Sequence, residues 1–126
     1  MNETGKTKIL VVDDSKVIRK MVGVILRSNG YVVVEAEDGL DALEKLLKDD
    51  YNLLITDLNM PRMDGFTLIK EVRKDEYYKF IPIIMLTTEA GENERRKGIE
   101  VGANVYLTKP TVPEEILINI QKLLKR

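Results

Sequence analysis

The sequence contains neither cysteine nor histidine. Without cysteine, the chain has no disulfide, no thiol nucleophile and no thiolate zinc site. Without histidine, it has no Ser-His-Asp triad, no imidazole base and none of the commonest transition-metal ligand. Any chemistry must therefore use carboxylates, hydroxyls, lysine, arginine or a bound ion, and oxygen ligands favour Mg²⁺, Mn²⁺ or Ca²⁺.

Long apolar runs and an excess of one sign of charge are also missing. The 126 residues are 44% hydrophobic and 33% charged, with a formal net charge of −1. This length suits one domain with one core, and the charge balance does not point to nucleic acid or to an anionic membrane. No apolar run approaches the roughly 20 residues that a bilayer crossing needs, and the N-terminus lacks a signal peptide's apolar stretch. We therefore expect a cytoplasmic protein.

Short apolar runs alternate with helical patterns after a polar N-terminal arm, residues 1–7, and predict a single domain over residues 8–126. The apolar runs predict strands over residues 8–12, 32–36, 53–56, 82–86 and 105–107. Apolar residues at helical spacing predict helices over 16–28, 39–48, up to 74, 92–101 and from 113 onwards. Ser15 and Asp38 are suitable N-caps for the first two helices.

The helical spacing also predicts which side chains face the core. We expect inward faces formed by Ile18, Met21, Val22 and Ile25; by Leu40, Leu43 and Leu47; by Leu68, Ile69 and Val72; and by Ile116, Leu117, Ile120, Leu123 and Leu124. The helix over residues 92–101 is mostly polar, with Ile99 as its main apolar anchor, and Gly98 costs it about 1 kcal/mol relative to alanine. It should be the least stable helix.

The strand pattern predicts the fold class. The runs are continuously apolar rather than alternating, which is typical of parallel strands covered on both faces. Parallel strands joined by helices take right-handed crossovers. We predict an α/β fold with a doubly wound five-stranded parallel sheet of order 2-1-3-4-5 and helices on both faces, a flavodoxin-like arrangement.

Three carboxylates stand at the ends of two predicted strands. Asp13 and Asp14 follow the first strand, and Asp57 follows the third. In such sheets, ligands bind beyond the carboxyl ends of the strands, where the strand order reverses. Crowded carboxylates raise one another's pKa or bind a cation, and oxygen ligands suit Mg²⁺. In the alternative interpretation, one aspartate caps the next helix and the other two are solvated. This explains the adjacent pair but not Asp57, which stands at the same place after the third strand.

Two more strand ends contribute polar groups. Thr87 and Thr88 end the fourth strand, and Lys109 with Pro110 follows the fifth. A metal, an ammonium, a hydroxyl and a free carboxylate together suit phosphoryl transfer. Asp57, which stands alone, is the best candidate for a nucleophile that forms an acyl phosphate. A plain surface cation remains the alternative for Lys109.

The chain resembles a known family through the segments VVDDS, LLITDLNMPRMDG, IIMLTTEA and GANVYLTKP. They resemble, in order and spacing, the receiver domains of bacterial two-component response regulators, especially the single-domain chemotaxis type. The resemblance runs from Lys8 to the C-terminus. It implies that Asp57 is the phospho-acceptor. It also implies that Asp14, Asp57 and the backbone carbonyl of Asn59 bind Mg²⁺ directly, with Asp13 acting partly through water.

Further roles follow from the same resemblance. Lys109 would contact the phosphoryl group, Thr87 would move to bond one of its oxygens, and Tyr106 would be the switch aromatic that turns inward. Asn59 and Glu89 occupy positions that tune autodephosphorylation. The sequence departs from the family pattern at Thr88, where alanine or glycine is frequent, and at Thr111, where a large residue is common.

The implied function is a phosphorylation-operated signalling switch. A sensor histidine kinase or phosphotransfer protein would supply the phosphoryl group, and a downstream target protein would read the surface formed by the fourth helix, fifth strand and fifth helix. Such a protein is not a conventional enzyme, but it catalyses its own phosphorylation and slow dephosphorylation. The chain ends at Lys125-Arg126, which favours a stand-alone regulator, although an excised piece would look identical.

Two alternatives belong to other classes. A metal-dependent phosphohydrolase with an aspartyl nucleophile would usually show an Asp-x-Asp pair after the first strand, whereas this chain has adjacent aspartates. An interaction module that works without phosphorylation would not need the full acidic set, Thr87 and Lys109.

Overall fold

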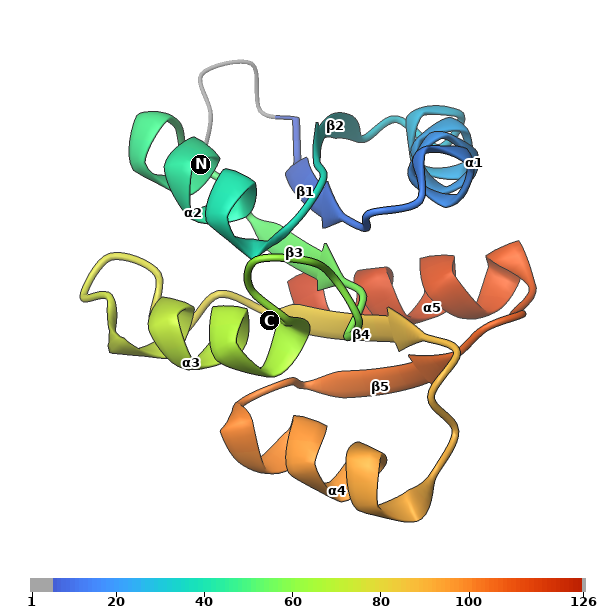
Figure 1. The fold of residues 1–126 in the computed structure, drawn as a ribbon. Helices are drawn as coiled ribbons and strands as arrows, with labels where there is room; N and C mark the ends of the chain where they lie inside the picture. The colour runs from blue at the N-terminus through green and yellow to red at the C-terminus, as the bar shows by residue number, and fades with distance from the viewer. Residues whose placement is uncertain (1–5, 126) are drawn as a thin grey trace.

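Strands and helices alternate along the chain in a computed structural model, which describes residues 6–125 (Figure 1). The strands are β1 (Lys8–Val12), β2 (Val32–Ala36), β3 (Leu53–Thr56), β4 (Ile83–Thr87) and β5 (Val105–Thr108). The helices are α1 (Lys16–Arg27), α2 (Gly39–Lys48), α3 (Gly65–Lys74), α4 (Glu92–Val101) and α5 (Pro113–Leu124). Of the predicted polar arm, residues 1–7, only residues 6 and 7 are among the described residues.

The strands form one parallel sheet in the predicted order, β2-β1-β3-β4-β5. Helices α1 and α5 cover one face of the sheet, and α2, α3 and α4 cover the other (Figure 1). The doubly wound α/β fold is therefore confirmed. The order reverses between β1 and β3, so the carboxyl ends of these two strands lie side by side at the switch point.

Apolar side chains leave each central strand in both directions. In β1, Leu10 and Val12 pack towards the α2–α3 side, whereas Ile9 and Val11 pack towards α1 and α5. All four side chains are buried. Both faces of the strand are covered, which explains why its sequence is continuously apolar.

Side-chain caps place the helix starts next to the strand ends. The Ser15 hydroxyl accepts from the Ile18 N–H, and the Asp38 carboxylate accepts from the Asp41 N–H, so both predicted caps are confirmed. Asp64 caps α3 in the same way, through the Thr67 N–H. Helices α1, α2 and α3 therefore begin at the edge of the sheet that carries the aspartates.

Element boundaries differ from the prediction by one residue at a few ends. Strand β4 runs from Ile83 to Thr87 rather than over 82–86, because Pro82 has no N–H to add to the ladder. Strand β5 extends to Thr108, which pairs in register with Thr87. Helix α1 ends at Arg27, one residue early.

The predicted inward faces of three helices are partly wrong. In α1, Met21 is 52% exposed, and Leu26 is buried together with Val22. In α2, Leu47 is 81% exposed and Leu40 is half-exposed. The buried residues of α2 are Gly39, Ala42 and Leu46. Small residues are among those that face the sheet in both helices: Gly23 in α1, and Gly39 and Ala42 in α2. A prediction based on large apolar residues therefore assigned the buried faces partly incorrectly.

Helix α4 shows the same effect most clearly. Ile99 is partly exposed, and Gly98 is the buried residue of the helix. A Cβ added at Gly98 would lie 2.8 Å from Cδ2 of Tyr106 and 3.0 Å from Sδ of Met85. Ile99 is therefore not the main anchor of α4, which packs through Gly98 against the sheet.

The expected faces of α3 and of most of α5 are confirmed. Leu68, Ile69 and Val72 of α3 are buried, as are Ile116 and Ile120 of α5. The remaining apolar residues predicted for the inner side of α5 are partly buried, and they are Leu117, Leu123 and Leu124. Among the helices of residues 6–125, none combines the length and the apolar character that a membrane crossing requires.

The two faces of α1 predict different responses to truncation. Leu26→Ala removes a fully buried side chain and should lower the free energy of unfolding by about 2–5 kcal/mol. Met21→Ala should lower it by less than about 1 kcal/mol, because Met21 is half-exposed. Urea denaturation followed by circular dichroism measures both values, and an equal loss in the two variants would contradict the observed orientation of α1.

Candidate functional site

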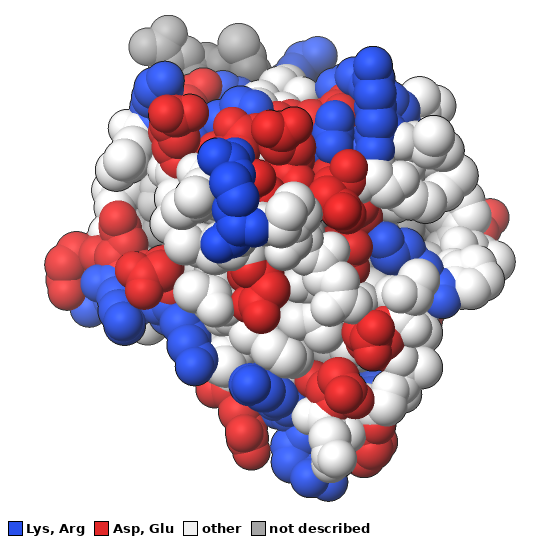
Figure 2. All heavy atoms as spheres, in the orientation of Figure 1, with Lys and Arg blue, Asp and Glu red and all other residues white. Residues whose placement is uncertain are grey.

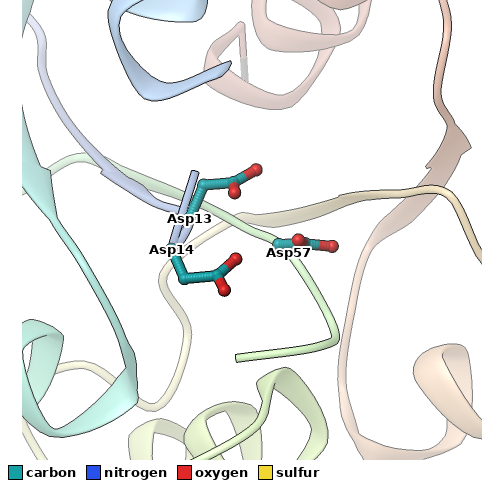
Figure 3. Close-up of side chains that lie close together, drawn as sticks. All are labelled: Asp13, Asp14 and Asp57. Carbon is teal, nitrogen blue, oxygen red and sulfur yellow. The ribbon is translucent and has the colours of Figure 1, made fainter. Parts of the chain in front are cut away.

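Asp13, Asp14 and Asp57 meet at the carboxyl ends of β1 and β3. The Asp57 N–H donates to the Val12 carbonyl (2.9 Å), which aligns the two strand ends. One carboxylate oxygen from each residue lies within 4.8 Å of the other two. Figure 3 shows the three carboxylates directed to the same side. Asp13 and Asp57 are buried, whereas Asp14 is exposed.

Lys109 brings a cation to this cluster. Its Nζ lies 2.8 Å from Oδ2 of Asp13 and 3.6 Å from Oδ2 of Asp57. The Lys109 N–H donates to the Thr87 carbonyl (2.7 Å), which ties the end of β5 to the end of β4. The Lys109-Pro110 peptide bond is cis. Lys109 is therefore part of the site rather than a free surface cation.

The cluster retains a surplus of negative charge. Burial and the neighbouring charge of Asp13 raise the pKa of the Asp57 carboxyl, although Lys109, the Leu58 N–H and Thr87 oppose that rise. In Figure 2, red Asp and Glu atoms gather on the face where β1 and β3 end, with blue Lys and Arg atoms beside them. One ammonium does not balance three carboxylates, so the cluster attracts a further cation.

The partners of each carboxylate show where that cation fits. Asp13 uses both oxygens, since Oδ1 accepts from the Ser15 N–H (2.9 Å) and Oδ2 from Lys109. Asp57 Oδ1 accepts from the Leu58 N–H (2.7 Å). Within residues 6–125, the Asp14 carboxylate has no hydrogen-bond partner. This all-oxygen donor set, with one unpaired acid at its open side, fits a hard divalent cation such as Mg²⁺.

Glu89 links the remaining predicted residues. Its side chain accepts from Asn59 Nδ2 (2.9 Å), and its carbonyl accepts from the Tyr106 hydroxyl (2.7 Å). The Glu89 N–H donates to Oγ1 of Thr87 (3.3 Å). Thr87 and Tyr106 are buried, and burial raises the pKa of the Tyr106 hydroxyl. The structure thus joins all the predicted residues around one strand edge.

Two arginines near the site were missed in the sequence. Arg19 donates to the Asp13 carbonyl (2.8 Å), and its place one turn into the helix after Ser15 was a usable signal. Arg62 pairs with the buried Asp38 (2.6 Å). Arg62 and Asp38 lie 24 positions apart in different loops, so no local sequence pattern connects them.

The fold and the site together define a class of signalling domain. Aspartates beyond two adjacent strands, a hydroxyl beyond the next and a lysine beyond the last are the arrangement expected of a domain that is phosphorylated on aspartate. A model of the family described as "Response regulator receiver domain" matches residues 9–121. The chain belongs to this family, and its function is that of a phosphorylation-dependent switch.

Individual relatives agree with this assignment. The chain is 44% identical over 119 residues to "Chemotaxis protein CheY1" of Helicobacter pylori, covering 93% of this chain and 96% of that protein. It is 40% identical to "Transcriptional regulatory protein ResD" of Bacillus subtilis, covering 100% of this chain but 51% of that protein. The solved structure of CheY4 from Vibrio cholerae matches with a TM-score of 0.88 and 45% identity, over 94% of this chain and 99% of that one.

The raised pKa of Asp57 predicts a pH-dependent gain in stability for Asp57→Asn. A raised pKa means that the folded state disfavours the ionised carboxyl, so ionisation costs stability above the folded pKa. Asparagine removes the charge and still accepts from the Leu58 N–H. In EDTA, the variant should have the larger free energy of unfolding at pH 7.

That gain should shrink as the pH falls towards 3.8, the ordinary pKa of the group, because the unsubstituted carboxyl then becomes neutral too. Urea denaturation at a series of pH values measures the difference. A variant less stable than the unsubstituted protein at pH 7 would refute the electrostatic cause.

Proposed function

We propose that Asp57 accepts a phosphoryl group from a sensor histidine kinase or phosphotransfer protein, with Mg²⁺ bound at the acidic cluster. The observation that carries this proposal is the convergence of Asp13, Asp14 and Asp57 within 4.8 Å, with Lys109 Nζ against two of them. Receiver domains pair with histidine kinases as a class. We also propose a cytoplasmic location, where such kinases present their phosphohistidine.

The metal would be held by Asp13, Asp14, Asp57 and the backbone carbonyl of Asn59. The unpaired Asp14 carboxylate and the raised pKa of Asp57, caused by burial, support a cation at this point. When bound, Mg²⁺ would neutralise the negative charge that is distributed over the phosphoryl oxygens. Asp13, whose oxygens already have partners, acts partly through water.

Asp57 and Lys109 carry the transfer. The Leu58 N–H holds Asp57 Oδ1, which leaves Oδ2, on the Lys109 side, to attack phosphorus. A P–O bond forms as the P–N bond to the donor histidine breaks, and the electron pair of that bond stays on the imidazole. Lys109 then turns from the carboxylates to the phosphoryl oxygens, since the new group carries more charge.

The response passes through Thr87, Tyr106 and α4. The Thr87 hydroxyl moves to a phosphoryl oxygen. Tyr106 was expected to turn inward at this step, but its ring is already buried and its hydroxyl already donates to the Glu89 carbonyl, so Tyr106 keeps this position. Helix α4 is anchored mainly by a buried glycine, so its displacement removes few apolar side chains of its own from the core. The surface of α4, β5 and α5 is therefore the proposed contact for a downstream protein.

The Asn59–Glu89 hydrogen bond lies beside this machinery. We assign both side chains to the tuning of autodephosphorylation, because Asn59 follows Asp57 by two residues and its side chain is held by Glu89. Slow dephosphorylation, rather than rapid turnover, separates this switch from the phosphohydrolase alternative. The similarity to chemotaxis proteins over nearly their whole length supports a chemotaxis-type output.

An apolar groove beside the aspartates suits the phosphotransfer partner. It has a volume of about 470 Å³ and opens onto Asp57 and Lys109. Ile18 and Met21 of α1 and Ile116 of α5 line it, together with the atypical Thr88. A partner that presents phosphohistidine from a helix can place apolar side chains in this groove while its imidazole approaches Asp57.

The phosphorylation site is tested by Asp57→Asn. With radiolabelled acetyl phosphate and Mg²⁺, the unsubstituted protein should incorporate label and the variant should incorporate none, because the nucleophilic carboxylate is gone. Asp64→Asn is the control, since asparagine also caps α3 and the side chain is exposed. Label on the Asp57 variant would disprove the assignment, and rapid multiple turnover of phosphate esters by the unsubstituted protein would favour the hydrolase.

The docking groove is tested by Met21→Glu. A charge in the apolar groove should slow phosphotransfer from a phosphorylated histidine protein by about tenfold, a loss of about 1.4 kcal/mol. Phosphorylation by acetyl phosphate, which needs no docking, should not change. Leu47→Glu is the matched control on the opposite face of the sheet, and equal slowing by both variants would contradict the groove as the docking site.

A further inference from the structure

The loop between β3 and α3 is attached to the first turn of α2. Nε of Arg62 lies 2.6 Å from Oδ2 of Asp38. The Gly39 N–H donates to the Met63 carbonyl (3.3 Å). A Cβ at Gly39 would lie 2.7 Å from Cγ of Met63, so glycine permits this close approach. An ion pair and a backbone hydrogen bond therefore fix the loop at neighbouring residues.

The ion pair differs from an ordinary surface salt bridge. The Asp38 residue is 2% exposed, and its Oδ1 is already used to cap α2 through the Asp41 N–H (2.9 Å). Burial raises the pKa of Asp38, but Arg62 and the Asp41 N–H outweigh that effect and lower it below the ordinary value. A buried carboxylate without its partner is strongly unfavourable, so Arg62 is held in place by Asp38.

The backbone at Arg62 is strained. Among the described residues, Arg62 is the one non-glycine residue with a positive φ, 65°. This left-handed conformation costs an ordinary side chain about 1–2 kcal/mol, and strained residues persist where the surroundings hold them. The contact of the guanidinium with Asp38 is therefore made at the cost of a strained backbone at Arg62. This indicates that the position of the guanidinium matters.

The loop lies next to the acidic cluster. Arg62, Asp38 and Pro61 line the same small pocket as Asp14. Asn59, whose carbonyl is a proposed metal ligand, belongs to this loop, and its side chain is held from the other side by Glu89 (2.9 Å). A change in the loop at Arg62 therefore reaches the segment that carries a ligand.

We propose that the Arg62–Asp38 pair is a positioning device for the metal site. It fixes the β3–α3 loop so that the Asn59 carbonyl is presented to Mg²⁺ beside Asp14. Arg62 and Asp38 touch neither the metal nor the phosphoryl group in this role. The inference rests on the proposed Mg²⁺ site and adds the residues that order one of its ligands.

A purely electrostatic effect of the two charges predicts a different change in Mg²⁺ affinity from a positioning role when Arg62 is substituted. Removing the positive charge of Arg62 next to Asp14 would strengthen Mg²⁺ binding, whereas removing the negative charge of Asp38 would weaken it. A positioning role predicts weaker binding in both cases, because either change frees the loop. The Arg62 variant therefore separates the two explanations by the sign of its effect, whereas the Asp38 variant is expected to weaken binding under both.

The experiment measures Mg²⁺ binding by isothermal titration calorimetry for Arg62→Ala, Asp38→Asn and the double variant. Asparagine at 38 still caps α2, so the helix start is kept. Each single variant should bind Mg²⁺ about tenfold more weakly. The double variant should be no weaker than the single variants, because the pair acts as one unit. Urea denaturation in EDTA reports folding separately.

Two further variants complete the test. Arg62→Asn adopts positive φ more readily than alanine but lacks the guanidinium, so it should lose Mg²⁺ affinity while the loop backbone stays unstrained. Arg27→Ala is the matched control, since Arg27 of α1 is a similarly exposed arginine paired with Glu35 of β2, and the Mg²⁺ affinity of this variant should be unchanged.

The outcomes distinguish this role from the function on which it rests. Tighter or unchanged Mg²⁺ binding by Arg62→Ala, with binding intact in the unsubstituted protein, would overturn the positioning role alone. Absence of Mg²⁺ binding in the unsubstituted protein would overturn the proposed metal site as well. Equal weakening by Arg27→Ala would also overturn the role, because the effect would then not belong to the loop.

Discussion

Repulsion between carboxylates at two adjacent strand ends is the constraint around which this structure is organised. Pairing of β1 with β3 brings the acids together whether or not their charges are balanced, because the register places Asp57 beside the end of β1. Lys109 offsets part of the charge, and burial keeps the pKa of Asp57 raised. The site is thus built with a deficit of positive charge, which suits the proposed binding of a cation.

The rest of the molecule supplies a rigid frame and one weakly held part. The central strands are buried on both faces, so the positions of the strand ends are set by the core. Helix α4, by contrast, contributes a single buried glycine. Glu89 lies between the two regions, and it contacts Asn59, Thr87 and Tyr106. A change at Asp57 therefore has a short physical route to the surface of α4 and β5.

The sequence predicted the fold and most of the site because both depend on strong local signals. Continuous apolar runs marked the parallel strands, and polar residues at their ends marked Asp13, Asp14, Asp57, Thr87 and Lys109. The helix faces were harder to predict. Met21 and Ile99 are large and apolar yet about half exposed, whereas Gly98 is buried, because the short distance between α4 and the sheet leaves room only for a small residue at that position.

By itself, the sequence determined which chemical groups stand at the end of each strand and that this chain contributes no thiol or imidazole to the chemistry. Only the tertiary structure decided which of these groups are in direct contact. The contact of Lys109 with Asp13 joins residues 96 positions apart, and the pairing of Arg62 with Asp38 joins two loops. Such contacts depend on how neighbouring strands and helices pack in three dimensions, and residue spacing along one chain does not encode that packing.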